Sequence, residues 1–257
     1  ETDKMWEHCP RNFLRKQVQK LKDQGLMVQS VFENEFFLLR KAINGAIEPV
    51  DDTVFSATGS MNRNIDFIND LADSLITQGV TVEGYYPESG PGQQELNIHY
   101  VDAMRSADQQ IIYRETVRGI ANQHGLIASF LPKIFEDKAG SGCHLNFSLW
   151  REGKNISGDP RQVNGMGFEV GAFIAGILDH LPALCAATIP SKNSYRRIRP
   201  HFWAGSFRSW GTQNREAAVR VCKNREGNLV KRIEYKISDA SANPYIALGF
   251  LIAAGLD

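Results

Sequence analysis

Carboxylates recur on stretches whose alternating pattern is typical of β-strands. In residues 28–39 (VQSVFENEFFLL) two glutamates two positions apart share one face, because alternate side chains of a strand point to the same side. Further glutamates precede and follow a Gly/Pro turn at residues 87–92 and lie on a strand at 229–237. Carboxylates gathered on one sheet face repel and raise one another's pKa unless cations lie between them. These glutamates are Glu33, Glu35, Glu88, Glu95 and Glu234.

A single imidazole lies on a fourth strand, residues 140–150 (GSGCHLNFSLW). One of its faces is apolar, and the other carries His144, Asn146 and Ser148. A lone histidine is more often structural, but three other strands carry matching polar faces. Carboxylate-rich ligation with one imidazole and no thiolate suits Mg²⁺ or Mn²⁺ better than zinc. The alternative is the solvated side of an antiparallel sheet; apolar neighbours such as Phe37 and Trp150 favour the metal interpretation.

Arginines form a second group of candidate functional residues. Guanidinium forks match phosphate and carboxylate oxygens bidentately, although each arginine by itself is more often a surface charge. Metals and arginines without a nucleophile–base pair favour phosphoryl transfer, in which catalysis is mostly positioning and charge neutralisation. No GxxxxGK[ST] motif occurs, so a nucleotide site would be of another kind. The arginines are Arg196, Arg197, Arg199, Arg208, Arg215, Arg220 and Arg232.

Composition excludes several partner classes. The 257 residues contain 29 Lys+Arg and 29 Asp+Glu, so nothing favours a nucleic acid or a membrane surface. The longest apolar run, 171–178, is far shorter than the ~20 residues of a membrane span. The four cysteines lack CxxC spacing, which favours reduced thiols. We therefore expect a cytoplasmic protein with no nucleic-acid or membrane partner.

Helix and strand patterns alternate without strict βαβ order, which favours an α+β fold. Turn residues and capping signals set the expected boundaries of these elements. Helices are expected at 10–24, 64–75, 103–124, 166–188 (interrupted at Pro182) and 244–255, strands at 28–39, 95–100, 127–131, 140–150, 215–222 and 229–237, and loops at 46–60, 155–164 and 194–211.

Seven motifs in order resemble the catalytic domain of glutamine synthetases and span nearly the whole chain. Each motif alone is weak, whereas seven in the same order are specific. They are FENEFFLL, PESGPGQQE, SFLPKIF with its preceding helix, AGSGCHLNFSLW, NSYRRIRP, WGTQNREAAVR and RIEYKISDASANPY. The resemblance implies one catalytic domain over residues 1–257, a curved and largely antiparallel sheet with helices on its outer face, and an N-terminal small domain that lies outside these residues.

The resemblance also implies a role for each matching residue. Glu35, Glu88 and Glu95 match the ligands of one Mg²⁺ or Mn²⁺, and Glu33, His144 and Glu234 match those of a second. Gly140 and Arg197 match positions that hold substrate glutamate; Asn146, Phe147 and Ser148 match an ATP-contacting segment; Arg215 and Arg220 match arginines that clamp the transferring phosphate. The implied reaction is phosphorylation of the γ-carboxylate of glutamate by ATP, followed by attack of ammonia. The family assembles as stacked rings of identical subunits.

Three positions depart from the family pattern. Trp203 stands where the family has a flap glutamate that deprotonates ammonium, Lys236 replaces a substrate-binding arginine, and Asn146 replaces a histidine. We therefore expect a ligase whose amine acceptor is ammonia or an organic amine. Trp203 would either stack on that amine or pack the flap shut. The alternative is an inactive scaffold or regulatory protein, which the six intact metal positions disfavour.

Overall fold

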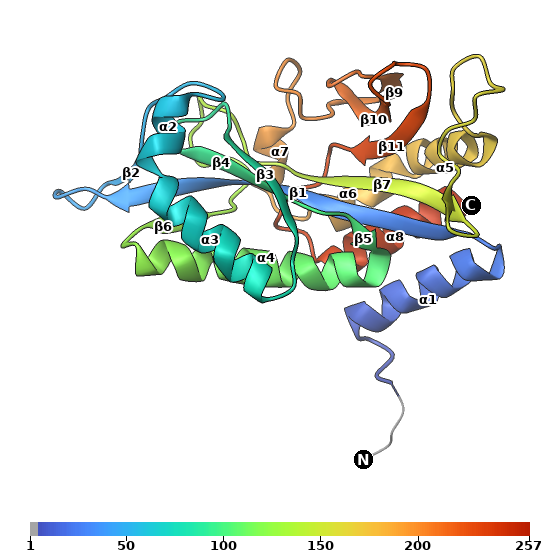
Figure 1. Ribbon diagram of the computed structural model, residues 1–257, viewed down its shortest axis with the longest axis horizontal. Coiled ribbons are helices and arrows are strands. Elements are labelled where there is room, and N and C mark those ends of the chain that lie inside the picture. Colours follow the sequence, from blue (N-terminus) through green and yellow to red (C-terminus); the bar gives the residue numbers. More distant parts are fainter. Residues whose placement is uncertain (1–4) are drawn as a thin grey trace.

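The centre of the fold is one long strand, β1 (Met27–Lys41), which crosses the whole molecule in Figure 1. The structure is a computed structural model and describes residues 5–257. Even-numbered residues of β1 such as Phe32, Phe36 and Leu38 enter the hydrophobic core and are at most 4% exposed. Glu33 and Glu35 point to the opposite face, as the period of two predicts.

Strands from the whole chain build one sheet around β1. Its main path runs β3-β4-β1-β7-β11-β10-β9, and every pair in it is antiparallel except β9 with β10. The α+β class and the largely antiparallel sheet are therefore confirmed. The other strands are β2 (Ile47–Pro49), β3 (Val82–Pro87), β4 (Gln93–Ile98), β5 (Val101–Asp102), β6 (Ile127–Ser129), β7 (Cys143–Arg151), β8 (Lys154–Asn155), β9 (Phe207–Thr212), β10 (Ala217–Lys223) and β11 (Val230–Tyr235).

The longer helices pack together beside one face of this sheet. In Figure 1, α1, α3 and α4 lie below β1, and both α1 and α4 contact it directly; α8 packs against α1 and α4. Asp102 caps α4 by accepting from the backbone N–H groups of Met104 and Arg105, and Asn243 caps α8 in the same way. The helices are α1 (Pro10–Asp23), α2 (Thr58–Arg63), α3 (Ile65–Thr77), α4 (Ala103–Gln123), α5 (Phe168–Asp179), α6 (Leu181–Thr188), α7 (Ser194–Arg197) and α8 (Pro244–Leu256).

Three expected segments differ from the structure. The stretch 46–60, expected to be a loop, contains β2 and the start of α2. The interrupted helix at 166–188 is two helices, α5 and α6, which meet at an angle of 77°. The stretch 194–211, expected to be a loop, begins with α7 and ends in the parallel edge strand β9. The aromatic residues of this stretch do not alternate regularly with polar ones, so the pattern did not predict a strand. Among the described residues no single helix is long and apolar enough to cross a membrane, although α5 and α6 taken together reach that length and composition.

A buried amide pair ties the helical layer to the polar strands. Asn34 on β1 and Gln110 on α4 donate to each other's side-chain oxygens at 2.6 and 2.7 Å. The thiol of Cys143 on β7 contacts both, at 3.2 and 3.3 Å. Because each amide satisfies the other in a dry interior, the pair fixes the backbone beside Glu33 and His144.

Candidate metal and nucleotide site

Strand register brings the predicted polar residues together on one face of the sheet. On the β1–β7 ladder Glu33 is directly opposite His144. On the β1–β4 ladder Glu35 is opposite Glu95. β11 pairs with the other edge of β7 and adds Glu234 to the same face. Directly opposite side chains lie about 5 Å apart, so this register alone makes a cluster.

The carboxylates and the histidine form two groups of three. Within each group the potential ligand atoms lie within 4.8 Å of one another. One group draws on three different strands, and the other combines β1 and β4 with the turn before β4. Five carboxylates and one imidazole without a thiolate are a donor set that fits Mg²⁺ or Mn²⁺. The groups are Glu33, His144 and Glu234, and Glu35, Glu88 and Glu95.

The electrostatics of this site favour cation binding. Burial and the neighbouring Glu88 raise the pKa of Glu35 to about 7. Burial and the charge of Glu35 raise the pKa of Glu95 well above its usual range. Burial and the nearby Lys236 lower the pKa of His144, which keeps its imidazole neutral and able to ligate. A divalent cation would relieve both the burial of charge and the mutual repulsion.

The carboxylate of Glu35 is oriented by its neighbours. Its Oε2 accepts from the backbone N–H of Gly142 at 2.8 Å and from Nε2 of Gln93 at 3.2 Å. The same Nε2 lies 3.1 Å from the carbonyl oxygen of Gly140, so Gln93 joins the metal group to the glycine loop. These bonds do not use Oε1 of Glu35, which lies 4.0 Å from Nε2 of His144 and can face a metal. Sequence reasoning missed Gln93, although it shares a strand face with Glu95.

Arg197 is the most rigidly held cation of the site. It is 4% exposed, and its guanidinium donates to the carbonyl oxygens of Lys236 (3.4 Å), Ile237 and Ser238 (3.1 Å). A Cβ on Gly140 would lie 2.6 Å from Cγ of Arg197, so the glycine permits the close approach of loop and arginine. The structure thus places the two predicted glutamate-binding residues in direct contact.

Glu234 is the centre of a buried ion-pair network. Its carboxylate pairs with Arg220 and with Nζ of Lys236 at 3.1 Å, and Nδ1 of His144 lies 3.3 Å away. The side chains of Glu234 and Lys236 are 2% and 4% exposed. Paired burial of this kind fixes the position of every member, since an unpaired charge here is costly.

A cavity of about 290 Å³ connects these groups, and carboxylates and cationic side chains line it in equal number. Five carboxylates line it together with five cationic side chains, so divalent cations would leave an excess of positive charge. That excess suits an anionic substrate such as a triphosphate. The cationic residues are Arg197, Arg215, Arg220, Arg232 and Lys236. The other predicted arginines, Arg196, Arg199 and Arg208, do not line this cavity.

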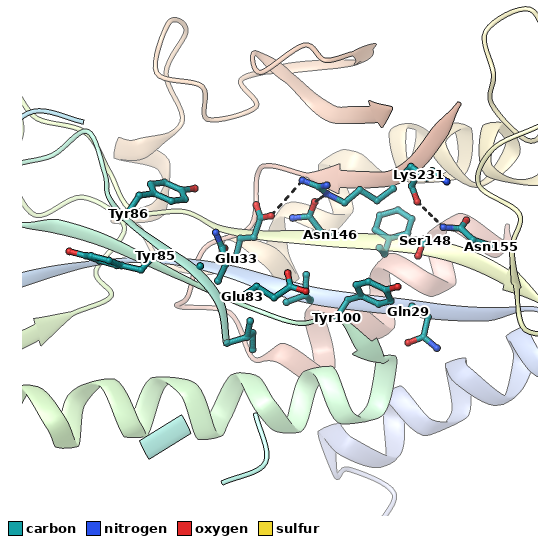
Figure 2. Close-up of a pocket in the computed structure, with 16 residues that line it drawn as sticks. Gln29, Glu33, Glu83, Tyr85, Tyr86, Tyr100, Asn146, Ser148, Asn155 and Lys231 are labelled. Carbon is teal, nitrogen blue, oxygen red and sulfur yellow. Dashed lines mark hydrogen bonds and ion pairs between the residues drawn. The ribbon is translucent and has the colours of Figure 1, made fainter. Parts of the chain in front are cut away.

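A second cavity of about 650 Å³ adjoins the first and shares Glu33, Tyr86, Asn97 and Arg232 with it. Its wall adds aromatic and uncharged polar side chains, such as Tyr100 and Ser148, to a few charged ones. In Figure 2, Glu33 lies between Tyr86 and Asn146, and Tyr100 and Ser148 lie further along the same cavity.

The predicted ATP-contacting segment runs along this second cavity. Asn146 accepts a hydrogen bond from Nε of Arg232 at 2.8 Å, which links its amide to the charged cavity. The hydroxyl of Ser148 accepts from the indole N–H of Trp150 at 2.8 Å. Phe147 is 2% exposed and packs on Phe173, with ring centroids 5.6 Å apart, so its ring belongs to the core.

Asp51 holds the segment that follows it, beside the site, by hydrogen bonds. Its carboxylate accepts from Ser60 Oγ at 2.7 Å, Thr53 Oγ1 at 3.0 Å and Asn64 Nδ2 at 3.0 Å, and from the backbone N–H of Gly92 at 3.2 Å. Burial alone would raise the pKa of Asp51, but the hydrogen bonds from Ser60, Thr53 and Asn64 lower it below the ordinary 3.8. Gly92 belongs to the turn between Glu88 and Glu95, so Asp51 also fixes that turn.

Replacing Asp51 with asparagine should therefore destabilise the fold in a pH-dependent manner. A carboxylate with a lowered folded-state pKa stabilises fully above its ordinary 3.8, and the contribution is lost as the pH falls through the lowered value. We expect Asp51→Asn to lose about 2 kcal/mol of unfolding free energy at pH 7 and progressively less towards pH 3. Urea unfolding of both proteins across this range measures the difference. A difference independent of pH would contradict the assigned role of the charge.

An antiparallel sheet that carries two carboxylate-rich groups beside arginines defines a class of site suited to metal-assisted chemistry on anions. Residues 7–257 match the family "Glutamine synthetase, catalytic domain". The chain therefore belongs to the glutamine synthetase family.

Named relatives and a solved structure agree with this membership. The chain is 35% identical to type-1 glutamine synthetase 1 of Dictyostelium discoideum over 99% of its length. It is 37% identical to gamma-glutamylpolyamine synthetase GlnA3 of Streptomyces coelicolor over 97%. The chain spans 54% of each of these relatives. A solved GmaS/ADP complex superimposes with a TM-score of 0.87 at 28% identity, covering 97% of this chain and 58% of that one.

Proposed function

We propose that this chain is the catalytic part of an ATP-dependent carboxylate–amine ligase. ATP would phosphorylate the γ-carboxylate of glutamate or a similar acid, and ammonia or an organic amine would then displace phosphate. Phosphorylation is needed because a free carboxylate is a poor acyl donor. The observation that carries this proposal is the meeting of two Mg²⁺- or Mn²⁺-type ligand groups with five cationic side chains in one cavity.

The nucleotide would occupy both cavities. Its adenosine fits the larger, aromatic cavity beside Tyr100 and Ser148, and its phosphates reach the charged cavity past Glu33. Arg215 and Arg220 would contact the transferring phosphate, since guanidinium groups stabilise its charge. Divalent cations held by the two ligand groups would neutralise phosphate charge and polarise the transferring group.

The acid substrate would lie between Gly140 and Arg197. Arg197 is already ordered by three backbone carbonyls, so little entropy is lost when it binds a carboxylate. Lys236 adds positive charge from the neighbouring strand, although its ammonium lacks the fork of an arginine. Together these residues would hold the γ-carboxylate near the phosphates.

The amine half of the site is the part that differs from the family pattern. Trp203 lines the charged cavity, and its indole cannot accept a proton from an incoming ammonium. Another group or water must therefore take that proton. An amine larger than ammonia is compatible with the part of the charged cavity that Trp203 lines. The relative GlnA3, whose name specifies a gamma-glutamylpolyamine synthetase, supports the organic amine as an acceptor. The cytoplasmic location and the ring-shaped homo-oligomer stay predictions.

Measuring ADP release tests the proposed function. The full-length protein with glutamate, ATP and Mn²⁺ should release ADP only when an amine is added, and the acceptors to compare are ammonia, methylamine, butylamine and a polyamine. Mn²⁺ with an ATP analogue should also raise the melting temperature, because both bind only the folded state. If none of the acceptors leads to ADP release, and neither ligand raises the melting temperature, the ligase assignment is wrong and the inactive scaffold is favoured. Ammonia outperforming every organic amine would restrict the acceptor to ammonia.

A further inference from the structure

Arg215 differs from the other three arginines of the charged cavity in how it is held. Within residues 5–257 its guanidinium makes no hydrogen bond or ion pair with a protein group. The others each have polar partners: Arg197 bonds to backbone carbonyls, Arg220 pairs with Glu234, and Arg232 bonds to Asn146. A free arginine side chain samples many rotamers, and ordering it costs about 2 kcal/mol of entropy.

The guanidinium of Arg215 has an aromatic contact in the part of the chain that the structure describes. Its Cζ lies over the ring of Trp203, 5.1 Å from the ring centroid, within the range of a cation–π interaction. Trp203 is 53% exposed, so the indole is not held by burial. Its position must come from the backbone of its own loop.

Glu216 supplies that backbone restraint. Its Oε2 accepts from the N–H of His201 at 3.0 Å, and its Oε1 accepts from the N–H of Trp203 at 3.1 Å. Both residues have positive φ, 67° and 52°, a conformation that costs energy for side chains of this size. Paired N–H groups around one carboxylate compensate for that strain. Because Glu216 follows Arg215 directly in the chain, one short segment holds the loop and presents the arginine.

We propose that Trp203 is a positioning residue for Arg215, and so acts on the phosphate half of the site rather than on the amine. Glu216 fixes the loop, the loop fixes the indole, and the indole limits Arg215 to conformations that face the charged cavity. This inference rests on the proposed function, in which Arg215 contacts the transferring phosphate. Indole contact with the acceptor amine is the competing role for Trp203.

Nucleotide binding without turnover tests this role. Calorimetry with Mn²⁺ and a non-hydrolysable ATP analogue should show a Kd about tenfold larger for Trp203→Ala. This is the effect of losing the cation–π contact and the ordering of the Arg215 side chain that it provides. Trp203→Phe should recover part of the affinity, because a phenyl ring still offers a π face. Glu216→Ser should weaken binding in the same direction while the indole is present. Trp210→Ala, which removes a comparably exposed indole from β9 outside the cavity, is the matched control and should bind as the parent does.

Steady-state kinetics separate the two roles of Trp203. We expect Trp203→Ala to raise the KM for ATP and lower kcat, with an unchanged KM for the amine. Unchanged analogue binding together with a raised amine KM would overturn the inference and leave the ligase function intact. A parent protein that binds no analogue would instead overturn the proposed function and the inference with it. Melting curves of each variant distinguish these results from misfolding.

Discussion

Replacing Glu234 with glutamine should destabilise the fold by about 3 kcal/mol in the absence of divalent cations and abolish the proposed ligase activity. Glutamine keeps the shape of the side chain but removes the negative charge that pairs with Arg220 and Lys236. Both partners are largely buried, and removing one member of a buried ion pair leaves an uncompensated charge in low dielectric. Activity should fall with stability because the same carboxylate is a member of the group with Glu33 and His144.

Denaturant unfolding in EDTA measures the loss of unfolding free energy, and ADP release measures the activity. The matched control is Glu115→Gln, which removes the carboxylate from an exposed pair with Arg118 at 2.7 Å. Exposed pairs contribute at most ~1 kcal/mol, so the control should remain close to the parent. A Glu234→Gln protein as stable as the control would mean that solvent reaches Arg220 and Lys236 and neutralises the effect of burial.

Strand periodicity predicted which residues share a face, and the structure agrees with it at the centre of the sheet. Glu33 and Glu35 lie on the face of β1 that points away from the core, and His144 lies on the corresponding face of β7. Periodicity does not specify register, since a slip of two residues preserves the faces but changes every neighbour. That Glu33 is opposite His144, and Glu35 opposite Glu95, therefore needed the structure.

Residues that orient the site were not predictable from local patterns. Asp51 reaches Gly92 across 41 positions of sequence, and Gln93 reaches Glu35 across 58. Such contacts depend on how loops close over the sheet, which composition and spacing do not encode. The resemblance to a family predicted the two groups of three side chains that the structure brings together. It could not place Trp203 over Arg215, because the family pattern has a different residue at the flap position.

The site is preorganised by hydrogen bonds to backbone groups. Glu35 accepts from the Gly142 N–H, Arg197 donates to the carbonyls of residues 236–238, and Glu216 accepts from the N–H groups of 201 and 203. Backbone groups move only with the fold itself, so they fix side chains more firmly than flexible partners do. Small changes in this backbone should consequently cost more activity than stability.

Gly140→Ala makes that consequence measurable. An added Cβ would lie 2.5 Å from the carbonyl oxygen of Pro132 and 2.6 Å from Cγ of Arg197. Arg197 cannot yield, because backbone carbonyls hold its guanidinium, so the loop must move and weaken the bond between Gln93 and the Gly140 carbonyl. We expect kcat/KM for glutamate to fall about 100-fold, since a displacement near 1 Å is worth that much at a reacting centre. The loss of unfolding free energy should be only about 1–3 kcal/mol.

Gly119→Ala is the matched control for the added methyl group. Gly119 lies within α4, and nothing is within 4 Å of its expected Cβ. Alanine is the better helix former by about 1 kcal/mol, so this variant should keep full activity and gain stability. Gly140→Ala with normal kinetics would show that the loop absorbs the methyl group without moving the substrate carboxylate. A loss confined to KM would place the defect in binding by Arg197, whereas an equal loss in kcat would mean that the γ-carboxylate no longer meets the phosphate in line.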